Sequence, residues 1–257
     1  MRPKHGPSPR ALAAGLRAGL ERLADPAGAK QALTYFREPV EVLGISTPVL
    51  RRLVREAHRG AARAWGLPQA LEACDLLLRD PRLEVKGAGL VLLGRFRRAF
   101  KPSMFRAVAS WLSSNRCDSW ATVDALCGEV LSPLLAMHPA LLARTWRWTA
   151  SRNRWMRRAS LACLVRMARR GERLHYVYSV ALRLVSDEED LVQKACGWLL
   201  REAGKTDARR LEAVLRRHGP RIRRTALRYA IERFPPAKRR ELLAATRGTA
   251  RLSSPDR

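Results

Sequence analysis

Trp120 and Asp124 stand four residues apart in a stretch of helical composition. Residues with this spacing lie on one face of a helix, one turn from each other. An indole and a carboxylate therefore share a face, while Val123, Leu126 and Val130 fall on the opposite, apolar side. An indole face attracts cations, and a carboxylate stabilises developing positive charge. The pair predicts a site for a group that is, or becomes, cationic.

A second indole, Trp198, shares its helical face with the basic side chains of Lys194 and Arg201. We expect the helix that carries Trp198 to lie beside the helix that carries Trp120. The two indoles and Asp124 would then converge on one ligand, with positive charge supplied around it.

Only one carboxylate is available to this expected site. Asp118 lies six residues before Asp124, about 240° away around a helix, and we expect it to be an N-cap. The two-carboxylate arrangement of most glycosidases is therefore absent. A single carboxylate suffices when the leaving group needs no protonation, as with a purine alkylated at a ring nitrogen, which is cationic and departs neutral. Asp124 would stabilise the oxocarbenium character on the deoxyribose and orient water; the alternative is that it only neutralises an arginine such as Arg158.

Metal and cofactor chemistry find no support in the sequence. The five histidines are scattered without ligand-spaced partners, and there is no nucleophile elbow, phosphate-binding loop or dinucleotide fingerprint. The five cysteines contain no C-x-x-C pair, so we expect reduced thiols that pack as small core residues. We predict no metal and no cofactor.

The charge balance points to an anionic partner. Lys and Arg number 50 against 23 Asp and Glu, a formal net charge of +27. Such an excess holds a polyanion by counterion release and repels other copies of the chain, so we expect a monomer that binds nucleic acid. An anionic membrane is the rival partner, but no stretch is typical of an amphipathic anchor and no uninterrupted run of 18 apolar residues occurs. We expect a cytoplasmic, bacterial-type protein that associates with the nucleoid when bound to DNA.

The pattern of the chain predicts an all-α protein. Ala, Leu, Arg and Glu dominate, alternation of β-branched residues is almost absent, and prolines interrupt the sequence at short intervals. We expect a basic disordered tail over 1–9, one helical domain over 10–245 and a disordered tail over 246–257.

The expected helices recur in pairs. Helix starts are expected near Leu83, Asp118, Asn153, Glu188 and Arg221, at intervals of 35, 35, 35 and 33 residues. A period of this length predicts an α-solenoid of HEAT-like repeats, in which the second helix of each pair lines a concave wall.

That wall is expected to be basic, forming a cradle for a duplex backbone. Its outward side chains are expected to be Trp120 and Asp124, then Trp155 and Arg158, then Lys194, Trp198 and Arg201, then Arg223, Arg224 and Arg228. The alternative is that these arginines are only the solvated faces of helices.

Four stretches carry a likeness to a known family. They are Leu43-Gly44-Ile45-Ser46-Thr47-Pro48, the Trp120 and Asp124 helix, Asn153-Arg154-Trp155-Met156-Arg157-Arg158-Ala159, and the segment 192–202 (Val-Gln-Lys-Ala-Cys-Gly-Trp-Leu-Leu-Arg-Glu) with Lys205-Thr206 after it. In these stretches the chain resembles the AlkD-type, HEAT-like-repeat DNA alkylation-repair glycosylases, over most of its length. The segment 192–202 is the most specific of the four.

The resemblance implies hydrolytic excision of N3- and N7-alkylpurines from double-stranded DNA, the first step of base excision repair. The family's catalytic pair falls on Trp120 and Asp124, its second indole on Trp198, and its backbone-contacting arginine on Arg158. Most glycosylases extrude the target base, whereas this family leaves the lesion in the duplex. One departure is Ser119, where some members carry a second aromatic residue; we expect an effect on sugar or phosphate contacts without loss of activity.

Two hypotheses follow. The first is a monofunctional alkylpurine DNA glycosylase, with Asp124, Trp120 and Trp198 as catalytic residues and no lyase step. Its expected DNA-binding residues are Arg158, Lys194, Arg157, Arg201, Arg223 and Arg224. The second is a non-catalytic HEAT-like repeat module that binds nucleic acid or an acidic protein. The meeting of the two indoles with Asp124 distinguishes the hypotheses.

Overall fold

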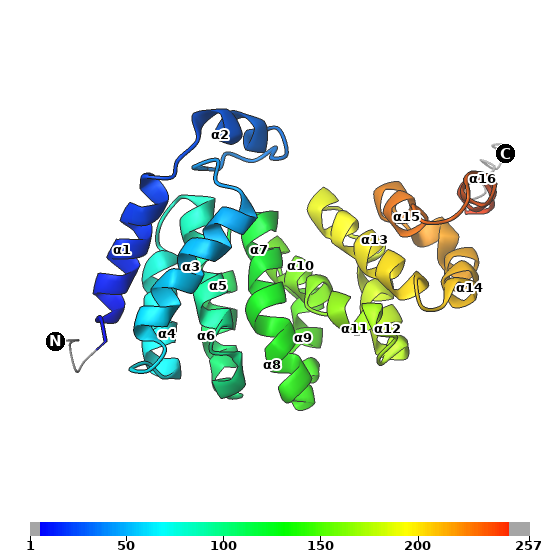
Figure 1. Cartoon of the computed structure of the whole chain (residues 1–257). Coiled ribbons are helices and arrows are strands. Elements are labelled where there is room, and N and C mark those ends of the chain that lie inside the picture. Colours follow the sequence, from blue (N-terminus) through cyan, green and yellow to red (C-terminus); the bar gives the residue numbers. More distant parts are fainter. Residues whose placement is uncertain (1–5, 247–257) are drawn as a thin grey trace, which may run out of the picture. The chain divides into compact units, whose positions relative to one another are not determined.

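The computed structural model describes residues 6–246, and within them the chain is all-α (Figure 1). The helices of its first half are α1 (Pro9–Glu21), α2 (Pro26–Leu33), α3 (Thr47–Ala61), α4 (Leu67–Leu77), α5 (Leu83–Gly94), α6 (Met104–Ser113), α7 (Trp120–Leu126) and α8 (Ser132–Met137). Those of its second half are α9 (Leu142–Arg147), α10 (Arg154–Ala162), α11 (Val165–Arg169), α12 (Leu174–Leu184), α13 (Asp190–Gly204), α14 (Ala208–His218), α15 (Arg224–Ala230) and α16 (Pro236–Ala245). The described residues form no β-strand; they contain an isolated β-bridge between Glu41 and Arg82. Most of both predicted tails, residues 1–5 and 247–257, lies outside the described residues; Pro9 already begins α1, with Ser8 as its N-cap.

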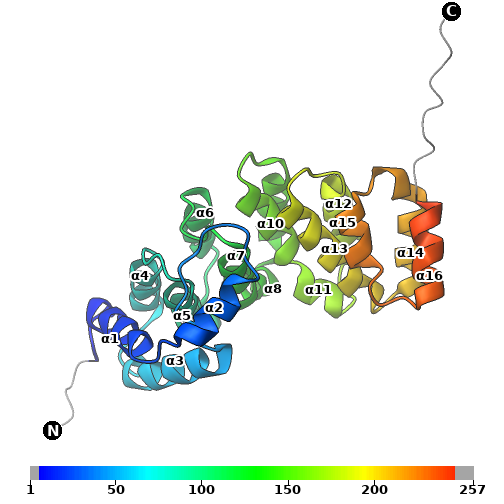
Figure 2. The same ribbon diagram turned by 90° about the horizontal axis from the view of Figure 1, so that it is seen from above.

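The chain forms two compact units that divide between Leu142 and Ala143. In the first unit, α5 packs against α1, α3, α4 and α7, and its residues from Ala88 to Gly94 are all buried. In the second unit, α13 is the central helix and packs against α10, α11, α12, α14 and α15. Figure 2 shows α16 beside α14, against which it packs. Each unit thus packs its helices around one central helix.

The predicted repeat is confirmed. Helices α5, α7, α10, α13 and α15 begin at Leu83, Trp120, Arg154, Asp190 and Arg224, each within about three residues of its expected start, as helix ends commonly vary. Local caps explain part of the agreement, because the side chain of Asn153 accepts a hydrogen bond from the N–H of Trp155. The all-α, helical-repeat fold class was therefore readable from the sequence.

Helix α7 continues into α8 through a π-helical turn, Cys127–Leu131. Pro133 explains this turn, because a proline ring clashes with the carbonyl four residues earlier in a regular α-helix. The N–H of Ser132 instead bonds to the carbonyl of Cys127, five residues back. By length and composition alone, Trp120–Met137 could cross a membrane, since its mean hydropathy is 1.2 although its apolar residues do not form an uninterrupted run. We interpret it as a core helix, since α7 and the π turn pack on α5.

The N-cap of α7 differs from the prediction. Ser119, not Asp118, caps the helix, because its hydroxyl accepts a hydrogen bond from the N–H of Thr122 at 3.2 Å. Asp118 instead pairs with the ammonium of Lys86 at 2.7 Å, and Lys86 is buried. A buried ammonium is costly without a partner, and that requirement, set by a residue on α5, was not visible in the local sequence.

Asp80 ties the turn between α4 and α5 to helix α1. Its carboxylate accepts hydrogen bonds from Nε of Arg17 at 2.7 Å and from Nε and the backbone N–H of Arg82 at 2.8 and 3.1 Å. Burial by itself raises the pKa of Asp80, but the hydrogen bonds from Arg82 and Arg17 outweigh it and hold the pKa at about 2.

This depressed pKa predicts an acid-sensitive fold. A carboxyl group whose pKa is lower when folded stabilises the fold above its unfolded pKa of about 3.9, and that contribution is lost as pH falls towards the folded value of about 2. We expect Asp80→Asn to lower the free energy of unfolding by about 2 kcal/mol at pH 7, with a difference that shrinks below pH 4. Urea titrations at several pH values measure it, with Glu72→Gln, an exposed residue of α4, as the control. A difference independent of pH would contradict this account.

Candidate functional site

Helix α7 presents Trp120 and Asp124 as the sequence predicted. Both side chains are half-buried, whereas Val123, Leu126 and Val130 on the opposite side are fully buried. The helix is therefore fixed by its apolar face, and the indole and the carboxylate share the other. This confirms the expected facing of α7, while the chemical role of the pair stays a prediction.

Trp120 has an aromatic partner that the sequence did not reveal. The ring of Phe36 stacks on the indole with ring centroids 5.0 Å apart and planes 17° from parallel. Phe36 follows α2 and is remote from Trp120 in the sequence, so no local spacing could connect them. An aromatic neighbour of Trp120 is thus contributed by another element.

Asp124 lines an open cavity of about 380 Å³ bordered by α7, its π turn, α5, α3, the end of α2 and the segment before α3. Apolar side chains that include Phe36 form part of its wall. Glu129 also lines it and is ion-paired with Arg51. Asp124 therefore borders a cavity in which the carboxylate of Glu129 is already paired with an arginine.

The segment 41–45 between α2 and α3, here called the bracket, forms part of the wall of this cavity. The carboxylate of Glu84 accepts hydrogen bonds from the backbone N–H groups of Leu43, Gly44 and Ile45 at 2.8, 2.8 and 3.2 Å. Gly44 has a φ of +79°, which L side chains rarely adopt. The Leu43-Gly44-Ile45 stretch is thus fixed to α5 through the carboxylate of Glu84. No local pattern in the sequence indicated this role for Glu84.

Helix α13 carries the second indole and two of the predicted basic residues. Trp198 is half-buried, and the adjacent Gly197 lies so close to α15 that a Cβ there would come within 2.4 Å of the carbonyl oxygen of Ala226. Lys194 pairs with Asp190, one turn away, at 2.8 Å, and Arg201 pairs with Glu232. The glycine before Trp198 therefore permits close packing of α13 on α15.

The predicted basic residues of α10 are engaged inside the second unit. Arg157 donates to Asp187 through Nε at 2.7 Å and to the carbonyl of Ser151 at 2.9 Å. Arg158 is 5% exposed and donates to the carbonyl of Leu191. The expectation that Trp155 and Arg158 face outward is wrong, because they are 4% and 5% exposed. A helix in the middle of a packed unit buries residues that its own sequence alone assigns to an outer face.

Arg223 and Arg224, at the start of α15, are exposed. Arg223 lies 3.8 Å from a carboxylate oxygen of Glu188, and Arg224 donates to the carbonyl of Leu243 at 3.2 Å. Of the six predicted DNA-binding residues, these two are therefore the most accessible.

The predicted catalytic residues, with the basic residues beside Trp198, fall into two groups. Trp120 and Asp124 lie together on α7 in the first unit, and Lys194, Trp198 and Arg201 lie together on α13 in the second. Convergence of the two groups on one ligand stays a prediction.

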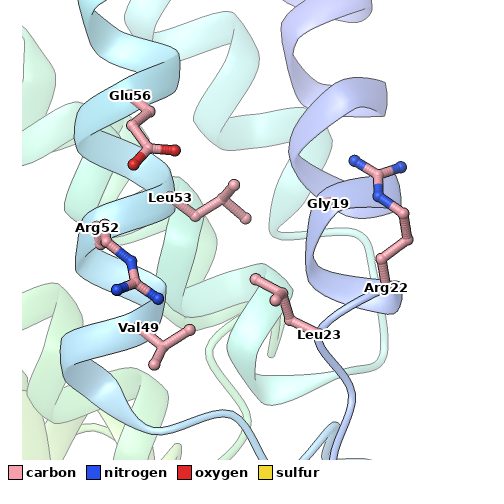
Figure 3. A pocket seen from close by; sticks show the side chains of 7 residues that line it. All are labelled: Gly19, Arg22, Leu23, Val49, Arg52, Leu53 and Glu56. Carbon is pink, nitrogen blue, oxygen red and sulfur yellow. The ribbon is translucent and has the colours of Figure 1, made fainter.

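A second cavity, of about 290 Å³, lies between α1 and α3 (Figure 3). Arg22 projects from the end of α1 and Arg52 from α3, with Leu23 and Leu53 between them (Figure 3). This cavity shares no lining residue with the one beside Asp124 and contains none of the predicted site residues.

The chain resembles known proteins in its sequence pattern and in its fold. The family model described as "DNA alkylation repair enzyme" matches residues 16–234. A solved structure of a "Predicted DNA alkylation repair enzyme from Enterococcus faecalis" has the same fold, with a TM-score of 0.72, 18% sequence identity, and coverage of 83% of this chain and 97% of that one. No curated protein matches the sequence significantly.

Proposed function

Because the chain belongs to the family of DNA alkylation repair enzymes, we propose that it is a monofunctional DNA glycosylase. It hydrolyses the N-glycosidic bond of cationic N3- and N7-alkylpurines in duplex DNA without extruding the base. The observation that carries this proposal is the half-buried pair of Trp120 and Asp124 on one face of α7, above a fully buried opposite face. A carboxylate beside an indole is suited to a cationic reacting centre.

The reaction needs one acidic residue. The bond between C1′ and the ring nitrogen breaks with its electron pair passing to the base, so the cationic purine leaves neutral. Positive charge moves onto the deoxyribose, where the Asp124 carboxylate stabilises it. Water then bonds to C1′, and its proton passes to Asp124 and on to solvent. Trp120 and Trp198 present electron-rich faces to the same cation.

The basic residues hold the backbone in this proposal. Arg223 and Arg224 are exposed, and Lys194 is partly so, which suits contact with phosphates. Arg157 and Arg201 already pair with Asp187 and Glu232, so a phosphate would have to compete with those carboxylates. Arg158, which is 5% exposed, is proposed to hold a phosphate of the backbone. We further propose a cytoplasmic monomer.

The test is the release of free base from methylated duplex DNA. We expect the protein to release 3-methyladenine and 7-methylguanine, detected by mass spectrometry, well above the spontaneous rate and without a borohydride-trapped adduct. Unmethylated duplex is the control. No release above the spontaneous rate would refute the proposal, and a trapped adduct would contradict its monofunctional character.

The phosphate contacts predict a change in salt dependence. Arg223→Ala removes one exposed guanidinium, so duplex binding should weaken several-fold at low salt and the slope of log K against log salt should fall by about 1. Arg170→Ala is the matched control, because Arg170 is exposed and pairs with Glu172 away from the predicted residues. Fluorescence anisotropy over a salt series measures both variants, and equal slopes would argue against a phosphate contact at Arg223.

A further inference from the structure

Phe36 is the side chain that connects α2 to the predicted site. Helix α2 has no fully buried residue, and the neighbours Leu33 and Tyr35 are 44% and 70% exposed. Phe36 instead is half-buried, stacks on Trp120 and lines the cavity beside Asp124. It is therefore the aromatic residue of this segment that turns towards α7.

The backbone holds Phe36 in this place. The chain turns directly after α2, where the N–H of Tyr35 bonds to the carbonyl of Ala32 and that of Phe36 to the carbonyl of Leu33. The other end of α2 is fixed as well, since the N–H of Asp25 bonds to the carbonyl of Leu43 at 2.8 Å.

The anchor at Leu43 is itself fixed from α5. Glu84 binds the backbone N–H groups of Leu43, Gly44 and Ile45. The N–H of Leu83 also bonds to the carbonyl of Glu41 at 2.9 Å. The start of α2 is thus hydrogen-bonded to the bracket, and the bracket is hydrogen-bonded to α5. Helix α7 packs against the same helix, α5. Phe36 and Trp120 are held from one common support.

We infer that Phe36 is a positioning residue that fixes the plane of the Trp120 indole for the reaction. This rests on the proposed function. One ring face of Trp120 lies against Phe36, and Trp120 remains partly exposed for a ligand. Stacked aromatic pairs have a preferred geometry, so Phe36 restricts the rotation of the indole before the substrate arrives. A group oriented in advance contributes to rate more than to binding.

The kinetic test uses three variants in single-turnover release of 7-methylguanine. We expect Phe36→Leu to lower the rate about tenfold to a hundredfold with nearly unchanged affinity for DNA, because orientation is lost but contacts are not. Phe36→Tyr keeps the stacked ring and should restore the rate. Phe96→Leu is the matched control, since half-buried Phe96 stacks on Trp65 in the same unit, with centroids 6.4 Å apart. Melting temperatures of all three report any general loss of stability.

A double-mutant cycle shows whether Phe36 acts through Trp120. In a Trp120→Ala background, Phe36→Leu should cause no further loss, because the ring it orients is gone. An equal loss in both backgrounds, or full activity of Phe36→Leu in otherwise unchanged protein, would overturn the inference.

A spectroscopic readout separates this inference from the proposed function. In protein labelled with 5-fluorotryptophan, the ¹⁹F resonance of Trp120, assigned with Trp120→Phe, should shift in Phe36→Leu and remain near its position in Phe36→Tyr. A resonance unmoved by Phe36→Leu would refute the positioning role. Absence of base release by the unaltered protein would refute the glycosylase proposal, and an unmoved ¹⁹F resonance would still refute the positioning role of Phe36.

Discussion

Asp124→Asn is expected to lower base release from methylated duplex DNA by about a hundredfold to a thousandfold, equivalent to about 3–4 kcal/mol of transition-state stabilisation. Asn keeps the shape of the side chain and removes the charge that faces the developing cation. Affinity for DNA should stay the same or rise, because a negative charge near a polyanion is lost. A fall in kcat without a rise in KM marks an interaction made in the transition state.

The matched control for this change is Glu129→Gln. Glu129 lines the same cavity and follows on the same continuous helix, but its carboxylate pairs with Arg51. Loss of that charge should leave base release within about threefold of the unaltered protein, as for a partly exposed ion pair. If Asp124 served only to neutralise an arginine, Asp124→Asn would lower the melting temperature and leave the rate per folded molecule unchanged.

Gly44→Ala is expected to cost the fold about 3 kcal/mol or more, combining a left-handed backbone with a steric clash. A Cβ at Gly44 would come within 2.1 Å of the carbonyl oxygen of Asp25 and 2.3 Å of the backbone nitrogen of Ala29. Both are backbone atoms of the start of α2, so relief requires the whole helix to move. Its displacement would carry Phe36 away from Trp120, and activity should fall even in the molecules that remain folded.

Chemical denaturation measures this destabilisation, with Gly60→Ala as the matched control. Gly60 lies in α3, and a Cβ there meets nothing within 4 Å. Alanine is favoured over glycine inside a helix, so this control should be neutral or slightly stabilised. Equal stability of Gly44→Ala and the unaltered protein would show that α2 is not held by the close contact at Gly44.

The facing and the starts of helices were predictable, because both depend on the local spacing of apolar residues along the chain. The facing of α7 followed from the positions of Val123, Leu126 and Val130, all fully buried. The starts of five helices followed from the helical pattern, and that of α10 also from the Asn153 cap. These signals depend on residues three or four positions apart, which a helix brings onto the same face.

Features set by distant residues were not predictable. Phe36 reaches Trp120 only because the bracket at Gly44 and Glu84 holds α2, and no spacing in the sequence relates these positions. Asp118 serves the buried Lys86 of α5 instead of capping α7. Trp155 is buried because the second unit packs around its helix. In each case a tertiary contact outweighed the local pattern.

The most direct measurement of the central claim, that Asp124 stabilises positive charge on the deoxyribose, compares two abasic-site duplexes. One carries a pyrrolidine ring, protonated where the oxocarbenium charge develops, and the other carries a neutral tetrahydrofuran ring. We expect the protein to bind the pyrrolidine duplex at least about tenfold more tightly, as for a transition-state mimic, and Asp124→Asn to abolish the preference. A chain of net charge +27 has no general reason to favour the more cationic ligand. Equal affinity for the two duplexes, or a preference that survives in Asp124→Asn, would contradict the account.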